Sequence, residues 1–439
     1  MYRNLFFTLL IVLLKSAIVN ATELTIEQAI DLAKKQSKEL QIVKAELDKA
    51  ETQIDEAFAA ALPNVSADFN YNRNLKDAKF FITAPDPQTG LSTTQELDFT
   101  FKNEFSFTAE LRQTIYSFGK VGTALDIAYA YQDFAEKNYR YQMQSILTNI
   151  RINFYRALLA QKIYDVSKES QNSAESNYKD TKLRYESGAA SEYDLLQAEV
   201  RWRNSIPQTI SAKKNYEQSL NMLKSELGIP IDEPLTLTGS LETRPVFPDS
   251  LDTDQVLSQR GDFQALKLES DMRDKNVTLE FANHLPTIDG RFVYTNSAQS
   301  DMFKYENNFD NYVAGLSLNI PIYSGGNTSA RVQKAELEHR QAVIRVEKAK
   351  DTIEMELTNA LLNLKEARER ITAAEKNEAT ARRAFEIAES RAENGLATQL
   401  ELKDSRLLLD QANVTHLTAH FDYLKAYFEW QLITGNWEE

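Results

Sequence analysis

Hydrophobic and polar residues alternate with a period of two in four short segments of the chain. In the first segment Val65, Ala67 and Phe69 alternate with Ser66 and Asp68. Alternation of this kind predicts a strand with one apolar and one polar face. The same pattern places strands at about 65–72, 104–112, 287–295 and 312–320. The segments that join the paired strands, at about 73–98 and 295–311, are interpreted as polar loops.

Long segments after each strand pair carry apolar residues at alternating steps of three and four. One such series begins at Val343 and Val346 and passes through Leu364 to Phe385. A heptad pattern kept over this distance predicts long helices that pack as coiled coils. The equivalent helix of the first half would reach roughly 100 Å at ~1.5 Å per residue. Each long helix ends at a glycine, and a second helix returns at about 192–226 or 399–433.

The chain repeats itself at a fixed interval. Tyr116 and Tyr323 each begin a Tyr-Ser segment, and they lie 207 positions apart. The same interval separates Gly188 from Gly395. Self-similarity at such a long period indicates two copies of one structural half. The resulting division is a first structural repeat at 22–228, a proline-rich connecting belt at 229–250 and a second structural repeat at 251–439.

The N-terminus has the features of a secretory signal. Arg3 supplies a positive charge, Leu5–Leu14 is an apolar core, and Val19-Asn20-Ala21 fits a cleavage site. Residues 1–21 are therefore predicted to be a signal peptide, with an uncleaved membrane anchor as the alternative. No later window approaches the ~20 apolar residues of a spanning helix. The mature protein would be exported, and it would cross a membrane only as strands.

Composition narrows the classes of partner and chemistry. A net charge of −14 disfavours nucleic acid and anionic membrane surfaces as partners. The chain has no cysteine, which excludes disulfides, thiolate metal sites, cysteine catalysis and a lipid-anchored N-terminal cysteine. With 42% hydrophobic and 26% charged residues, the chain is too apolar to be disordered.

Four amphipathic strands cannot close into a membrane barrel by themselves. An open edge in lipid leaves backbone groups unpaired at several kcal/mol each, and bacterial outer-membrane barrels begin at about eight strands. If the strands span a membrane, the chain must therefore oligomerise. Two copies would supply about eight strands and three copies about twelve, with a wider pore. The alternative is a soluble sheet packed on the helices.

Several features in a fixed order resemble the TolC family of outer-membrane efflux channels. They are the signal peptide, the Tyr-Ser segments, the glycine tips, and the Leu-Pro pairs that precede each strand pair, Leu62-Pro63 and Leu285-Pro286. The resemblance covers essentially the whole mature chain. It implies an α+β membrane fold, in which a trimer forms a twelve-stranded β-barrel through the outer membrane and a barrel of twelve helices in the periplasm. It also implies that the tips meet a periplasmic adaptor and carry the gate.

Three carboxylates lie just beyond the predicted tips. Glu401 and Asp404 are three residues apart and therefore share a helix face, and Asp194 lies 207 positions before Glu401. A trimer would turn each into a ring of about three carboxylates, which favours cations and repels anions. By resemblance, Glu401 and Asp404 match the acidic constriction of the periplasmic gate, and Asp194 matches the acidic tip residue of the other hairpin. The alternative for each is an ordinary solvated carboxylate in a chain with 64 acidic residues.

The tip residues are small or apolar, and by resemblance they are predicted to contact the adaptor. They are Gly188, Ala189, Ala190, Ser191, Gly395, Leu396, Ala397 and Thr398. Ordinary helix–turn–helix chemistry is the alternative reading of the same residues. One departure from the family is evident. Its best-known members lock the closed tip with a tyrosine before the second glycine turn and an arginine after it, where this chain has Ala392 and Ala397.

His416 and His420 have the spacing of a helical metal-binding pair. The zinc-protease motif requires a glutamate after the first histidine, whereas Leu417 follows here, and the sequence shows no third ligand. The chain also lacks a glycine-rich phosphate loop and the nucleophile motifs of hydrolases. The sequence therefore predicts no metal, no cofactor and no catalysis.

Together these features predict a passive exit duct in the outer membrane of a Gram-negative bacterium, serving tripartite efflux or type I secretion. A homotrimer in outer-membrane lipid would couple, through a periplasmic adaptor protein, to an inner-membrane pump of the RND, ABC or MFS type. Drugs, metal ions and secreted proteins are all candidate cargoes. The alternative is a soluble exported coiled-coil protein that binds partners through its helices, and an exported hydrolase ranks behind both.

Overall fold

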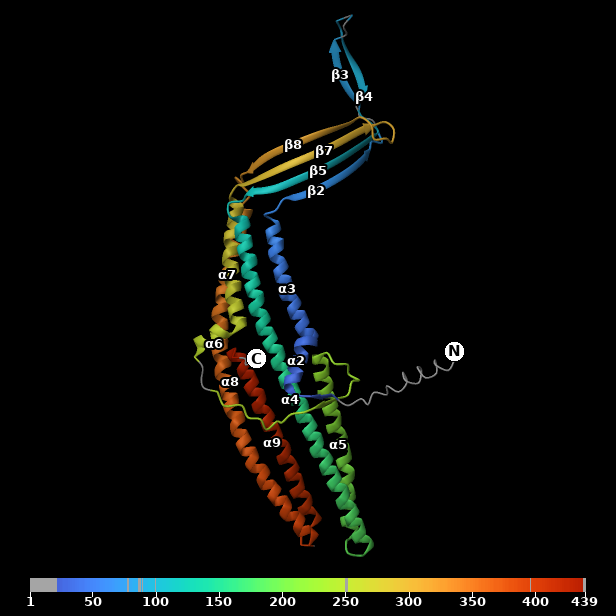
Figure 1. The fold of residues 1–439 in the computed structure, drawn as a ribbon, viewed down its shortest axis with the longest axis vertical. Helices are drawn as coiled ribbons and strands as arrows, with labels where there is room; N and C mark the ends of the chain where they lie inside the picture. The colour runs from blue at the N-terminus through green and yellow to red at the C-terminus, as the bar shows by residue number, and fades with distance from the viewer. Residues whose placement is uncertain are drawn as a thin grey trace, which may run out of the picture. The chain divides into compact units, whose positions relative to one another are not determined.

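The computed structural model describes residues 22–76, 79–85, 88, 90–98, 100–248, 252–394 and 396–436. The predicted signal peptide and Gly395 lie outside these residues. The chain divides into two compact units, drawn in Figure 1. The first, here called the helical unit, contains Met1–Leu47, Ala135–Ala265 and Val346–Glu439. The second, here called the strand unit, contains Asp48–Phe134 and Leu266–Arg345.

Helices make up most of the described chain, and their lengths repeat between the two halves. The two long helices have 67 residues each, and the two returning helices have 36 residues each. The helices are α2 (Ile26–Gln36), α3 (Lys38–Ala59), α4 (Lys120–Glu186), α5 (Glu192–Leu227), α6 (Thr253–Gln259), α7 (Gly261–Phe281), the 3₁₀ turn η1 (Ala282–His284), α8 (Asn327–Glu393) and α9 (Gln399–Thr434). Among the described residues, none of these helices combines the length and apolarity that crossing a bilayer requires.

The helical unit is held together by apolar clusters along the paired helices. Phe154 and Leu147 of α4 and Leu223 of α5 are fully buried in one cluster that also receives α2. A second cluster joins α8 to α9, with Leu364 packed near Trp430. The heptad pattern of the sequence has placed these side chains on facing sides of adjacent helices. A short parallel pair, β1 (Thr22–Leu24) with β6 (Leu235–Leu237), completes this unit.

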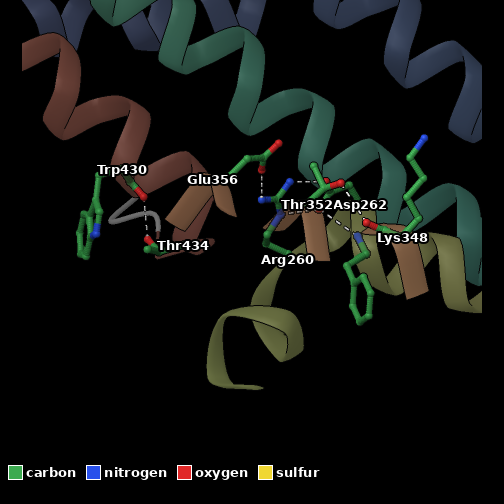
Figure 2. Close-up of polar contacts among 8 residues, drawn as sticks. Arg260, Asp262, Lys348, Thr352, Glu356, Trp430 and Thr434 are labelled. Atoms are coloured by element: carbon green, nitrogen blue, oxygen red, sulfur yellow. Dashed lines mark hydrogen bonds and ion pairs between the residues drawn. The ribbon is translucent and has the colours of Figure 1, made fainter. Parts of the chain in front are cut away.

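The buried side chain of Arg260 fixes the corner between α6 and α7. This side chain is 6% exposed, and its guanidinium contacts the carboxylates of Asp262 and Glu356 at 2.6 Å each (Figure 2). Burial would lower the pKa of Arg260, but hydrogen bonds to the two carboxylates outweigh this and raise it. The ring of Tyr141 lies beside the guanidinium. In Figure 2 the same region shows Thr434 donating to the backbone oxygen of Trp430, at 2.9 Å.

The strand unit contains the four amphipathic strands that alternation predicts. They form one antiparallel sheet in the order β2-β5-β7-β8, as Figure 1 shows. Phe69 pairs with Phe107, and Tyr294 pairs with Tyr312, so that apolar side chains share a face. That face is exposed in the single chain, with Phe69 at 64%. The strands are β2 (Asn64–Arg73), β5 (Asn103–Tyr116), β7 (Thr287–Ser300) and β8 (Asn308–Asn319).

One prediction about this unit is wrong. The segment interpreted as a polar loop between the first two strands contains a second hairpin, β3 (Lys79–Pro85) with β4 (Ser92–Asp98). These two strands pair only with each other in the described sheets, and β3 is exposed along its whole length. When both faces of a strand are exposed to solvent, no buried face selects apolar residues at every second position. Phe80, Phe81 and Ile82 therefore follow one another without alternation.

Candidate functional site

The first tip is a tight turn between α4 and α5. Gly188 adopts a left-handed backbone with φ of +78°, which favours glycine. The amide of Gly188 donates to the carbonyl of Tyr185 at 2.9 Å, and that of Ala189 donates to Arg184 at 2.7 Å. These bonds satisfy carbonyls that the end of a helix leaves unpaired. The glycine therefore stops α4 and reverses the chain.

A capping box starts the returning helix α5. The Ser191 hydroxyl accepts from the amide of Asp194 at 3.1 Å, and the Asp194 carboxylate accepts from the amide of Ser191 at 3.3 Å and from its hydroxyl at 2.7 Å. Two amides at the helix start are thereby paired. Asp194 is half-buried in this arrangement. The side chain proposed as a gate residue thus has a local structural role.

The second tip repeats the first, 207 positions later. The amide of Leu396 donates to Arg391 at 2.7 Å, and the Arg391 guanidinium donates back to the carbonyl of Leu396 at 3.0 Å. Thr398 caps α9, with its hydroxyl accepting from the amide of Glu401 at 3.2 Å. The Glu401 carboxylate in turn accepts from the amide of Thr398 at 2.9 Å. Asp404 lies on the next turn and is exposed, as is Glu401.

Sequence reasoning missed the capping role of Asp194 and Glu401. Both follow a serine or threonine by three residues at the start of an apolar periodic run, and this spacing signals a capping box. The predicted tip residues that the structure describes lie at the two turns. Ala189 and Leu396 are exposed, and Ala190 and Ala397 are half-buried. Ala392, on the last turn of α8, is also half-buried.

A buried polar network joins the two hairpins above their tips. Arg406 of α9 is 6% exposed, and its Nε donates to Asp410 Oδ1 at 2.9 Å. The other oxygen of Asp410 accepts from the hydroxyl of Ser170 on α4 at 2.6 Å. Arg406 also reaches Glu169 of α4 at 3.5 Å and lies over the ring of Phe385 of α8. Three helices from both hairpins therefore meet at one guanidinium.

The network borders a cleft of about 1110 Å³ lined by α4, α5 and α9. Arg201, Asp410 and Lys403 contribute charges to its wall. Burial lowers the pKa of the Arg201 guanidinium, and the nearby Asp410 opposes this shift. The sequence gives little sign of this site, because an Arg and an Asp four residues apart are ordinary on an exposed helix face. Only the contacts with α4 and α8 distinguish the pair, and these contacts are tertiary.

Comparisons with known proteins agree on one class of protein. The family model described as "Outer membrane efflux protein" matches residues 29–229 and 253–436. The chain is 21% identical to the outer membrane protein TolC of Vibrio cholerae, over 93% of this chain and 90% of that protein. It is 22% identical to the alkaline protease secretion protein AprF of Pseudomonas aeruginosa, over 87% of this chain and 78% of that protein.

A solved structure shares the fold. The CmeC outer membrane channel of Campylobacter jejuni superposes with a TM-score of 0.77 at 21% identity. The match covers 93% of this chain and 85% of that channel. The long helices, the returning helices and the strand pairs therefore belong to a known architecture.

Proposed function

The chain belongs to the outer membrane efflux protein family, and from this premise we propose how its strands and tips work. The family places the protein in the outer membrane as an exit channel for efflux or type I secretion, which confirms the prediction from sequence. Its members are channel proteins, so we infer that this chain is a passive conduit with no catalysis of its own. The energy for transport would come from an inner-membrane pump.

The proposed channel is a homotrimer. β2 and β8 are the edges of the described four-stranded sheet, and each pairs on one side only. The apolar face of the sheet is exposed, with Leu316 at 76% and Phe69 at 64%. Unpaired edges and an apolar face are both costly in water, and neighbouring copies with lipid would satisfy them. Three chains would contribute about twelve strands to one closed barrel.

The tips are proposed to contact a periplasmic adaptor and to carry the gate. Ala189 and Leu396 are exposed beside turns that the capping boxes hold rigid. In a trimer, Asp194, Glu401 and Asp404 would each be present in three copies around the axis. Because Asp194 and Glu401 are tied to backbone amides, their carboxylates are held in place, while Asp404 is exposed one turn further along. Such rings would attract cations to the entrance.

We further propose that the Arg406 network keeps the tip closed. The family's tyrosine and arginine lock is replaced here by Ala392 and Ala397, so closure needs another contact. The bonds from Asp410 to Ser170 and to Arg406 connect the second hairpin to the first. Opening requires the helix pairs to move against one another, which would break these bonds. This link between hairpins is the observation that carries the proposal.

Single-channel recordings in planar bilayers test the lock. Arg406→Gln should raise the conductance several-fold, because the buried charge that joins the hairpins is removed. Arg203→Gln is the matched control, because Arg203 occupies the position equivalent to Asp410 and forms an exposed pair with Glu199. It should conduct like the unmodified protein. Equal conductance in both variants, with heat-resistant trimers intact on gels, would remove Arg406 from the gate.

The same recordings test the carboxylates. Replacing both Glu401 and Asp404 by alanine should weaken block by multivalent cations added on the periplasmic side. Unchanged block would assign those carboxylates to ordinary solvated or capping roles.

The oligomeric state tests the trimer itself. A purified protein that stays a single subunit without detergent would overturn the proposed trimer.

A further inference from the structure

All four histidines of the chain lie in the second repeat, and two of them touch. His416 and His420 are one turn apart on α9, and their Nε2 atoms are 3.0 Å apart. The sequence offered no third ligand for this pair. The structure supplies one, because α8 brings Glu375 to the same place. One ligand atom from each of the three residues lies within 4.8 Å of the other two.

These separations suit a small divalent cation. Donor atoms at ~2.0–2.1 Å from a tetrahedral zinc ion are about 3.4 Å from one another. The two imidazole nitrogens would therefore need to separate by only a few tenths of an ångström. The Glu375 carboxylate, whose ligand atom lies within 4.8 Å of the imidazole nitrogens, would move by up to about 1.4 Å (4.8 − 3.4), which a flexible side chain accommodates by rotation. Two imidazoles with one carboxylate form a donor set typical of zinc sites that keep a fourth position for water.

The surroundings orient one of the imidazoles. His416 Nδ1 lies 2.5 Å from the Glu378 carboxylate, which also accepts from Arg382 at 2.7 Å. A carboxylate on Nδ1 fixes the proton there and turns the Nε2 lone pair outward, as in the outer shell of many zinc sites. His420 is 3% exposed, and among the described residues its Nδ1 has no hydrogen-bond partner. Ligation through Nε2 would place the proton of the neutral His420 imidazole on this Nδ1.

One competing contact involves the segment between the repeats. Arg244 pairs with Glu375, and Glu242 lies near the same cluster. A carboxylate has two oxygens, so Glu375 can keep Arg244 on one and offer the other to a cation. A bound cation would then connect α8, α9 and the connecting belt through Arg244.

We propose that Glu375, His416 and His420 bind a divalent transition-metal cation such as Zn²⁺. The first repeat holds no equivalent, because Lys168, Thr209 and Lys213 occupy the corresponding positions 207 residues earlier. Among the described residues the cluster occurs once, so one ion per chain is expected. Binding requires deprotonated imidazoles, so affinity falls as protons compete at low pH.

Metal titration of the purified mature protein in detergent, after treatment with a chelator, tests this site. Co²⁺ should give visible absorption bands that saturate at one ion per chain, and Zn²⁺ should displace it. Glu378→Gln should weaken Zn²⁺ binding by about 10-fold. His416→Gln and His420→Gln should each weaken it more, because each removes a direct ligand. His339→Gln is the matched control, because His339 also lies near a carboxylate, 3.9 Å from Asp274, but among the described residues it belongs to no cluster of three ligands.

Several outcomes would overturn the site. They are no saturable binding by the unmodified protein, unchanged affinity when both His416 and His420 are replaced, or loss of binding in His339→Gln. Because a replacement at buried His420 could disturb folding, X-ray absorption of the unmodified zinc-loaded protein supplies a second test. Its spectrum should show two imidazole nitrogens in the metal shell, and a shell of oxygen alone would contradict the proposal.

Discussion

The two repeats share their turns and differ in their charged interiors. Both returning helices end at a left-handed glycine, Gly228 or Gly435, that packs on the end of a short helix at Gln36 or Gln259. Both begin with a capping box. Where the second repeat buries Arg260 at a helix corner, however, the first has Ser37, which is also buried. Backbone constraints have kept the hairpins alike while the side chains between helices diverged.

Each repeat has polar side chains between its helices at positions where the other repeat does not. The first repeat places Asn153 and Glu226 between α4 and α5, with a hydrogen bond of 2.6 Å. The second repeat has Ala360 and Ile433 at the equivalent positions, and both belong to its apolar cluster. Conversely, the buried pair of Arg406 and Asp410 corresponds to an exposed pair of reversed charge in the first repeat. Equivalent helix contacts therefore tolerate polar or apolar side chains.

The largest expected effect is at the helix corner. Arg260→Met should lower the free energy of unfolding by about 3 kcal/mol or more, because it leaves two carboxylates beside a site built for a cation. The matched Ser37→Ala change in the first repeat should cost about 1 kcal/mol or less. Guanidinium titrations in detergent, followed by helical circular dichroism, measure both. Equal losses at the two corners would mean that the ion pairs do not distinguish the repeats.

An intermediate effect is expected at the glycines that the repeats share. A β-carbon at Gly228 would meet the backbone oxygen of Gln36 at 2.8 Å, and one at Gly435 would meet Gln259 at 3.0 Å. A left-handed backbone costs a residue other than glycine about 1–2 kcal/mol. Because of the close contacts, each alanine variant should lower the free energy of unfolding by more than this amount. Gly188→Ala is the control, because open space surrounds its β-carbon. A smaller loss at Gly228 than at Gly188 in the same titrations would contradict the close packing.

The smallest expected effect is on the pH dependence of stability, through Glu226 of the first repeat. Burial raises the pKa of Glu226 above its usual value, although Asn153 opposes the shift and Glu39 and Arg156 lie nearby. The folded state thus keeps this proton to higher pH than the unfolded chain does. The contribution of the Glu226 carboxyl to the free energy of unfolding is therefore fully present below the ordinary carboxyl pKa. It is lost as the pH rises through the raised pKa of the folded state. Glu226→Gln should flatten that fall in unfolding midpoints, whereas exposed Glu217→Gln should not.

Much of the fold follows from periodicity, because burial on one face imposes a pattern that sequence alone reveals. The four strands and the long helices are of this kind, whereas the glycine stops follow from the left-handed backbone that glycine favours. The hairpin from Lys79 to Asp98 is not, since β3 is exposed along its whole length. Asp194 and Glu401 carried a readable capping signal in addition to the predicted gate role. Sequence could not reveal the partners that come from other helices, namely Glu169 for Arg406 and Glu378 for His416, because they are distant in the sequence.

The extra hairpin makes the two strand loops unequal. Leu62 and Leu285 lie 223 positions apart, and Tyr116 and Tyr323 lie 207 apart, so the first loop is 16 residues longer (223 − 207). Because β3 and β4 form their own two-stranded sheet, none of the hydrogen bonds of the four-stranded sheet depends on them. The segment is therefore a suitable place to insert an antibody epitope or a fluorescent label. Because only the first repeat contains the hairpin, each subunit would carry one label rather than two.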